Sequence, residues 1–305
     1  MNLETKRKMD TALQIILALL SAVSILITIA IIWVLVSDTI IFFTHQESGG
    51  FPKSIIRFFT EKEWTPTFAN KQIGIWPLLN GTFLIAIISM VISIPLGLLI
   101  SIYLSEYSTW KIREVIKPFL DFLSAIPTVV YGYFALLFIT PILQSIFGKL
   151  GVEVQGMNAL SPGIAIGIMI LPFTSSMVED SLKGVPQDLR EASYALGASK
   201  IRTTLLVVVP AARSGIISAY LLGFSRAIGE TMVVAVAAGM YPQITLNPLE
   251  PIQTITGYIV QVALGDLPFR SFEYLSIFAA GFSLFLITLI FNSIAVYLKS
   301  RSSGY

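Results

Sequence analysis

Six long apolar stretches constrain this chain more than any other feature of its sequence. A helix that crosses the hydrocarbon core of a bilayer needs about 20 predominantly apolar residues. The stretches that reach about this length are Leu13–Val36, Leu78–Leu104, Pro118–Phe147, Leu160–Val178, Ser214–Gly239 and Tyr274–Leu298. They lack the alternating pattern of a membrane β-barrel, so we predict an all-α membrane protein with six transmembrane helices.

Composition supports this fold class and excludes several functions. Only 12% of the 305 residues are charged, and the mean hydropathy is +0.80. These values exclude an ordinary soluble enzyme, a disordered protein and a nucleic-acid-binding protein. The chain has no cysteine and one histidine, His45, so we expect no disulfide and no metal site.

The first apolar stretch follows Lys6, Arg7 and Lys8, as the apolar part of a secretory signal does. It is longer than such a segment and no small-x-small cleavage site follows it, so we interpret it as a retained span. We therefore divide the chain into residues 1–70, which hold one helix and an outer loop, and residues 71–305, which hold the main transmembrane domain.

The basic residues predict the orientation of the spans. If the N-terminus is cytoplasmic, 13 of the 20 lysines and arginines fall in inside segments and 6 fall outside. Cytoplasmic loops carry such an excess. We expect a multi-pass protein with both termini in the cytoplasm.

The cytoplasmic loop at residues 186–210 is the most informative segment. Good helix formers begin it, Gly197 permits a sharp reversal, and an amphipathic piece leads to Pro210. Two short helices joined at a glycine would form a projecting knob that fits a groove on a partner protein.

The same loop resembles the EAA loop of ABC-importer permeases. The matching residues are Glu191 and Ala192, then Gly197 four positions after Ser193, and Pro210 at the end. The resemblance implies the bundle of a type I ABC importer in the cytoplasmic membrane of a prokaryote, with this loop docked on a dimer of ATP-binding subunits. The chain has no G-x-x-x-x-G-K-[ST] phosphate loop. ATP must then bind to the partner, so we expect a transport subunit with no cofactor and no enzymatic activity of its own.

Three further segments are similar to phosphate-importer permeases of the PstC type. They are residues 73–107, 121–136 and 225–239, the last reading SRAIGETMVVAVAAG. The resemblance implies uptake of inorganic phosphate, a second permease subunit of the PstA type and an extracytoplasmic phosphate-binding protein. We also expect contact with membrane lipid and no binding of nucleic acid.

Arg226 and Glu230 are the charges expected deepest in the membrane. Arg226 stands about 13 residues into its span, which at 1.5 Å per residue is ~20 Å deep. On one continuous helix the two side chains would share a face. They form either a structural ion pair or part of an anion path, in which Arg226 attracts the oxyanion and Glu230 limits how tightly it is held. We expect Asp121, Glu179 and Asp180, near span ends, to be solvated.

Other functions compete with this hypothesis. The chain could carry another oxyanion, such as sulfate or molybdate, or work without ATP as a secondary anion transporter. A membrane-bound enzyme of phospholipid chemistry would need clustered acids or histidines, which are missing. Gly163 and Gly167, one helical turn apart, would allow two spans to approach closely in any of these proteins.

Overall fold

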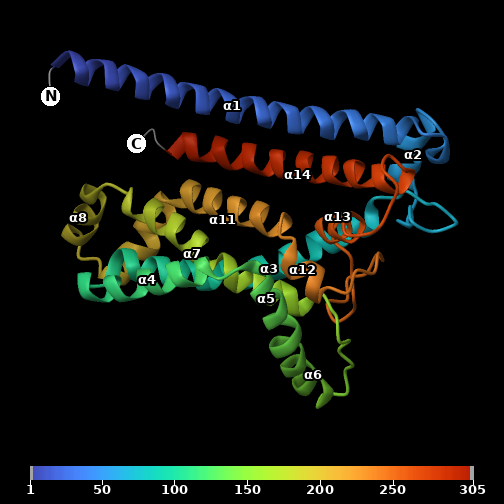
Figure 1. Ribbon diagram of the computed structural model, residues 1–305. Helices are drawn as coiled ribbons and strands as arrows, with labels where there is room; N and C mark the ends of the chain where they lie inside the picture. The colour runs from blue at the N-terminus through green and yellow to red at the C-terminus, as the bar shows by residue number, and fades with distance from the viewer. Residues whose placement is uncertain (1–2, 303–305) are drawn as a thin grey trace.

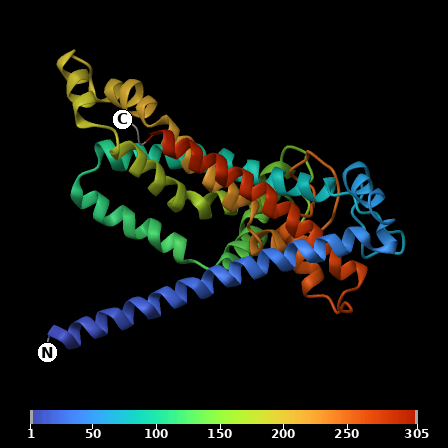
Figure 2. The same ribbon diagram turned by 90° about the horizontal axis from the view of Figure 1, so that it is seen from above.

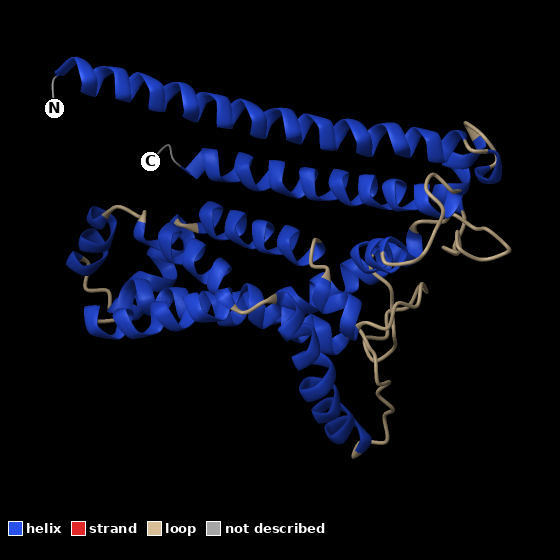
Figure 3. Ribbon diagram, viewed as in Figure 1, coloured by secondary structure: helices blue, strands red, loops and turns tan. Residues whose placement is uncertain are grey.

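The computed structural model describes residues 3–302, and helices joined by loops make up this part of the chain (Figure 3). The α-helices are α1 (Leu3–Thr44), α2 (Lys53–Thr60), α3 (Trp76–Ile102), α4 (Trp110–Ala125), α5 (Thr128–Phe134), α6 (Thr140–Gly148), α7 (Leu160–Lys183), α8 (Gln187–Ala195), α9 (Lys200–Thr203), α10 (Val209–Ala211), α11 (Arg213–Ile228), α12 (Met232–Ala237), α13 (Ile255–Ala263) and α14 (Phe272–Ser302). A short 3-10 helix, η1 (Gln46–Ser48), and three π-helical segments, η2 (Tyr103–Tyr107), η3 (Ala135–Ile139) and η4 (Thr204–Val208), complete the list.

Within residues 3–302, five helical segments are long and apolar enough to cross a membrane. They are Ala12–Thr44, Trp76–Tyr107, Thr128–Gly148, Leu160–Lys183 and Phe272–Ser300. A sixth is reached if the segments Lys200–Ala211 and Arg213–Ile228, bent by 69° at Ala212, count as one. The predicted all-α membrane fold is confirmed, with two changes in the predicted spans.

The third span begins ten residues later than predicted. Ile126 and Pro127 are extended, with ψ of 127° and 138°, and separate α4 from α5. Proline lacks the amide proton a helix needs and favours an extended residue before it. The predicted start at Pro118 was therefore wrong, and α4 is a separate helix that buries none of its side chains within the described chain.

The fifth span is not continuous, which the prediction of one helix from Ser214 to Gly239 missed. Helix α11 ends at Ile228, and α12 starts at Met232 after an irregular segment that contains Gly229 and Glu230. The short α12 reaches only Ala237, and the chain continues as a loop to α13.

The α7 helix lies at the centre of the bundle and packs along α3 and α11. Its glycines explain the close approach to α3. A Cβ atom on Gly163 would lie 2.5 Å from Cγ2 of Ile88, and one on Gly167 would lie 2.9 Å from the carbonyl oxygen of Ser89. The prediction that these glycines permit close packing is confirmed. Ser93 Oγ, 3.0 Å from Thr174 Oγ1, adds a hydrogen bond between the two helices.

A second apolar cluster joins the outer loop to the bundle. It combines Phe42 of α1, Phe58 of α2 and Trp64 with Tyr258 of α13 and Phe272 of α14, among others. The division of the chain at residue 70 stays a prediction, and the residues on its two sides share this core.

Lys71 adds an ionic contact to the same end of the molecule. Its ammonium lies 2.6 Å from Glu273 Oε1 and also donates to Glu47. Burial alone would lower the pKa of Lys71, but the hydrogen bonds to Glu273 and Glu47 outweigh it and raise this pKa. The lysine therefore stays charged at neutral pH and holds the outer loop to the start of α14.

The N-terminal end of α1 and the C-terminal end of α14 lie at the same end of the molecule as α8 (Figure 1). The loop around α2 lies at the opposite end of the molecule. Seen from above, α1 diverges from the bundle toward its N-terminus (Figure 2). This arrangement agrees with both ends of the chain and the loop at residues 186–210 lying on one side of the membrane. Which side this is remains a prediction. The structure does not describe the side chains of Lys6, Arg7, Lys8 and Arg301, on which part of that prediction rests.

We predict that Gly167→Ala destabilises the bundle by about 1–3 kcal/mol, because overpacking forces backbone or side chains to shift. The matched control is Gly148→Ala, where an added Cβ meets nothing within 4 Å. Thermal unfolding of the purified protein in detergent measures both. Equal melting temperatures for the two variants would contradict close α3–α7 packing at this glycine.

The orientation is tested by single cysteines placed in this cysteine-free chain. Asn70 and Ser199 are both exposed and lie in the outer loop and the knob, respectively. An impermeant thiol reagent added to sealed cells should label Asn70→Cys and leave Ser199→Cys unlabelled until the membrane is opened. The reverse pattern would invert the predicted topology.

Candidate functional site

The segment from α8 to α9 forms a knob at one end of the bundle. Gly197 has φ of +82°, the left-handed conformation that only glycine adopts readily. Its amide donates to Tyr194 O at 2.9 Å, and the amide of Ala198 donates to Ser193 O at 3.2 Å. These bonds form the Schellman motif, which ends α8 and turns the chain back. The two short helices joined at Gly197 are as predicted.

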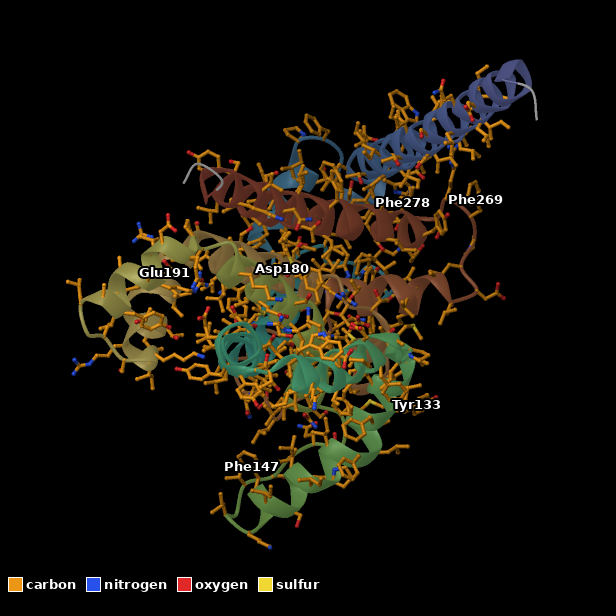
Figure 4. The ribbon with its side chains drawn as sticks, turned by 90° about the vertical axis from the view of Figure 1, so that its left-hand side faces the viewer. Tyr133, Phe147, Asp180, Glu191, Phe269 and Phe278 are labelled. Atoms are coloured by element: carbon orange, nitrogen blue, oxygen red, sulfur yellow. The ribbon has the colours of Figure 1, made fainter. Side chains whose placement is uncertain are left out.

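The knob is closed by one polar contact and presents one apolar tip. Ser193 Oγ of α8 lies 2.9 Å from Thr203 Oγ1 of α9. Leu196, beside the turn, is 90% exposed. Glu191 and Ala192 are also exposed, and Figure 4 shows Glu191 on the part of α8 that projects from the bundle. Tyr194 and Ile201 of the knob are exposed as well, and grouped exposed apolar side chains mark interaction surfaces.

Pro210 lies in α10, at the end of the loop that contains the knob. After it the chain bends at Ala212 and enters α11. Pro210 lies near the end of the continuous helical stretch Lys200–Ala211, directly after the π-helical segment η4. The loop is thus joined to α7 at one end and to α11 at the other.

Arg226 lies in the last turn of α11, and its side chain is exposed on the single chain. Its guanidinium carbon lies 5.3 Å from the centroid of the Phe173 ring on α7. A cation over an aromatic face is attracted by the ring quadrupole. The guanidinium has no protein acceptor within hydrogen-bonding distance among the described residues.

Glu230 lies beyond the end of α11, so the two charges are not on one helix face. No ion pair joins Arg226 to Glu230 within residues 3–302, which corrects the pairing considered above. Glu230 Oε1 instead accepts from the amides of Met232 and Val233 at 3.2 and 3.4 Å. It caps the start of α12, while its carbonyl accepts from Thr256 Oγ1 at 2.7 Å.

Glu179 is not solvated, contrary to prediction. It is 1% exposed, and the cations of Lys183, Lys117 and Arg113 lie 2.5, 3.3 and 3.5 Å from its carboxylate. A buried carboxylate needs such partners. Asp121 and Asp180 are exposed as predicted. The spacing of Lys183 four residues after Glu179, and of Lys117 four after Arg113, was a signal for this cluster that we did not use.

The described residues contain no group of three or more His, Asp or Glu side chains that could hold a metal ion. The arrangement comprises a projecting knob, a buried ionic cluster and, at a helix break, an arginine that has no ion-pair partner among the described residues.

Comparison with known proteins agrees with this geometry. Residues 93–304 match the family described as "Binding-protein-dependent transport system inner membrane component". The "Probable ABC transporter permease protein YqgH" of Bacillus subtilis is 32% identical over 81% of this chain and 79% of its own length. The "Phosphate transport system permease protein PstC" of Mesorhizobium japonicum is also 32% identical, over 80% of this chain and 78% of that protein.

The fold matches a solved transporter as well. The structure of a bacterial alginate ABC transporter in complex with its periplasmic protein includes a chain similar to this one, with a TM-score of 0.58. The match covers 92% of this chain and 95% of that chain at 15% identity, so it supports the fold alone.

These matches show the general class of the protein. Permeases of this family cross the inner membrane several times, have no cofactor and work with a separate ATPase and a binding protein. The chain belongs to the family of binding-protein-dependent transport system inner membrane components, and is a non-catalytic permease subunit of an ABC importer.

Proposed function

We propose that this permease carries inorganic phosphate, as the PstC-type subunit of its importer. Its partners would be a PstA-type permease subunit, a dimer of ATP-binding subunits and an extracytoplasmic phosphate-binding protein. The similarity to a phosphate transport system permease protein supports the substrate. The subunit type is supported by the segment Gly229-Glu230-Thr231-Met232, which resembles the corresponding segment of PstC-type permeases.

Arg226 at the break between α11 and α12 is the observation that carries the proposal. Irregular backbone at membrane depth is tolerated only where protein buries it or where it lines a water-filled cavity. An arginine at this depth costs at least about 2.5 kcal/mol on insertion scales, so it is retained for a partner or a ligand. Arg226 has open donors, and phosphate offers several acceptor oxygens to a planar guanidinium.

Glu230 has a structural role and a proposed role in transport. As the cap of α12 it holds the irregular segment in place. Its negative charge close to the path would also weaken anion binding, so that phosphate is released. Structure and transport can be separated here, because glutamine keeps an oxygen for the α12 amides and removes the charge.

The knob is the proposed site of coupling to the ATPase. Glu191, Ala192 and Gly197 lie on it, and Pro210 follows it before the bend into α11. When the ATPase closes on ATP, a displacement of the knob would reach both α7 and α11. We place the knob and both termini in the cytoplasm, in agreement with the shared end of the molecule in Figure 1.

We predict that Arg226→Gln inserts normally but lowers phosphate uptake by about 10–100-fold, the loss expected from one charged hydrogen bond worth ~1.5–3 kcal/mol. The control is Arg213→Gln. Arg213 is also exposed on α11, but it lies at the opposite end of this helix from the break before α12. Uptake of radioactive phosphate, normalised to inserted permease, measures both variants, and Glu230→Gln is assayed beside them.

Three outcomes bear on the proposal. Full uptake by Arg226→Gln would remove this residue from the path. Uptake of sulfate or molybdate by the wild type, with phosphate unable to compete, would reassign the substrate. Uptake without the ATPase would favour a secondary transporter.

We also predict that Gly197→Val leaves insertion intact but weakens ATPase binding several-fold. A non-glycine residue in the left-handed region costs about 1–2 kcal/mol and would open the turn. A Cβ at Gly197 meets nothing within 4 Å, so a clash cannot explain the effect. The control is Gly184→Ala, at a helix end with φ of −67°. Co-purification of the ATPase with each variant is the measurement, and equal recovery would contradict docking at this turn.

A further inference from the structure

The knob has a third attachment to the bundle, besides its two chain connections. Arg190 is the residue of α8 that comes directly before Glu191, and it is only 9% exposed. Its Nη2 lies 3.0 Å from Oε1 of Glu106, whose side chain is 7% exposed. Glu106 belongs to η2, which continues α3 at the knob end of the bundle. A buried ion pair therefore links the knob to a helix that is remote from it in sequence.

The same guanidinium also reaches the end of α7. Arg190 Nη1 donates to Val185 O at 2.6 Å, and Nη2 donates to Leu182 O at 2.9 Å. Leu182 lies in the last turn of α7, where its carbonyl also accepts from the amide of Val185 at 3.3 Å, and Val185 lies in the turn that follows the helix. The planar, five-donor head of arginine can serve all three acceptors, which a lysine cannot do with the same fixed geometry. The side chain thus fixes α8 relative to both α7 and α3.

A buried ion pair is weak evidence for a gain in stability, since desolvation offsets much of the attraction. It does fix geometry, because moving either charge away leaves the other unpaired in a place that excludes water. Two of the elements near the joint, η2 and η4, are π-helical. Such segments occur often at functional sites and are less regular than the α-helices they interrupt.

We propose that Glu106 and Arg190 form the joint that transmits movement of the knob to α3. This inference rests on the proposed docking of the ATPase at the knob. The chain connections carry a displacement of α8 to α7 and α11, and the ion pair carries it to α3 at the same time. α3 already packs along α7, and the joint adds a direct link between the knob and the end of α3 beside it. Glu106 and Arg190 are positioning residues: neither needs to touch the transported anion or ATP.

The test uses the complete transporter, with its ATPase, in sealed proteoliposomes. The variants are Glu106→Gln, Arg190→Gln and the double change. The double variant leaves no unpaired buried charge, so it can be tested even if a single variant fails to fold. The control is Glu114→Gln, an exposed acid on α4 at the same end of the bundle. Three quantities are measured for each: recovery of the ATPase, rate of ATP hydrolysis, and phosphate imported per ATP hydrolysed.

We expect the variants to bind the ATPase and hydrolyse ATP, but to import about tenfold less phosphate per ATP, as expected from losing one buried charged hydrogen bond. The double variant should lose no more than each single one, because the two residues act as a unit. Glu114→Gln should match the wild type. A purely structural ion pair would lower the amount of assembled protein and leave phosphate per ATP unchanged, which would overturn the proposal.

A second readout needs no transported substrate and so separates this proposal from the phosphate assignment. Tyr103 lies at the start of η2 and is 41% exposed. A cysteine placed by Tyr103→Cys should react with a thiol reagent at a different rate when ATP is added to the otherwise wild-type complex. In the Glu106→Gln background, ATP should no longer change this rate. If the wild type imports no phosphate but the label behaves in this way, the substrate assignment fails and the joint stands. A response that persists without the ion pair refutes the joint.

Discussion

Close packing of α3 against α7 is the contact on which the rest of this structure depends. Lipid tails are as apolar as leucine, so helices in a bilayer associate through close fit and hydrogen bonds. Gly163 and Gly167 provide the fit, and the Ser93–Thr174 contact adds a hydrogen bond. Both elements of the candidate site are built on this pair of helices. The knob continues from the end of α7, and Arg226 lies over Phe173 of the same helix.

Arg226 and Glu230, the two charged residues expected to act together, have different neighbours and different roles. Glu230 is held by the amides of α12, whereas Arg226 has an aromatic ring on one side and open donors on the other. The helix break between them makes this possible, since a continuous helix would place both on one face. Their separation therefore favours the anion-path hypothesis over the simple ion pair, which would satisfy both charges and leave nothing for a ligand.

The sequence predicted the features that rest on short-range chemistry. Gly197 was identified as a reversal because glycine reaches positive φ at little cost, and the Gly163 and Gly167 spacing gave the helix contact. The knob and the all-α class follow from such local patterns. The domain division and the roles of the site residues stay predictions, because such roles depend on contacts with other subunits and with the solute.

The failures came from features that hydropathy does not record. Pro127 ends α4 although the apolar run continues through it, and the irregular segment after Ile228 divides an equally apolar run. Glu179 was misjudged because its cations come largely from α4, which is distant in sequence. The ion pair of Glu106 and Arg190 was missed for the same reason. Long-range charge pairing leaves only weak traces in a single sequence, since each partner alone resembles a solvated residue at a span end.

The exposure of Arg226 bears on how the transporter is assembled. A guanidinium at this depth on a lipid-facing surface would have to be hydrated by deforming the bilayer, at a cost of several kcal/mol. A second permease subunit packed over this face would remove the contact with lipid and enclose a polar space between the subunits. The anion would then meet Arg226 in an environment with less water than bulk solution, where its attraction to the charge is stronger. In the proposed transporter the single chain therefore supplies one wall of the path, and the arginine becomes a binding group only when the other wall is in place.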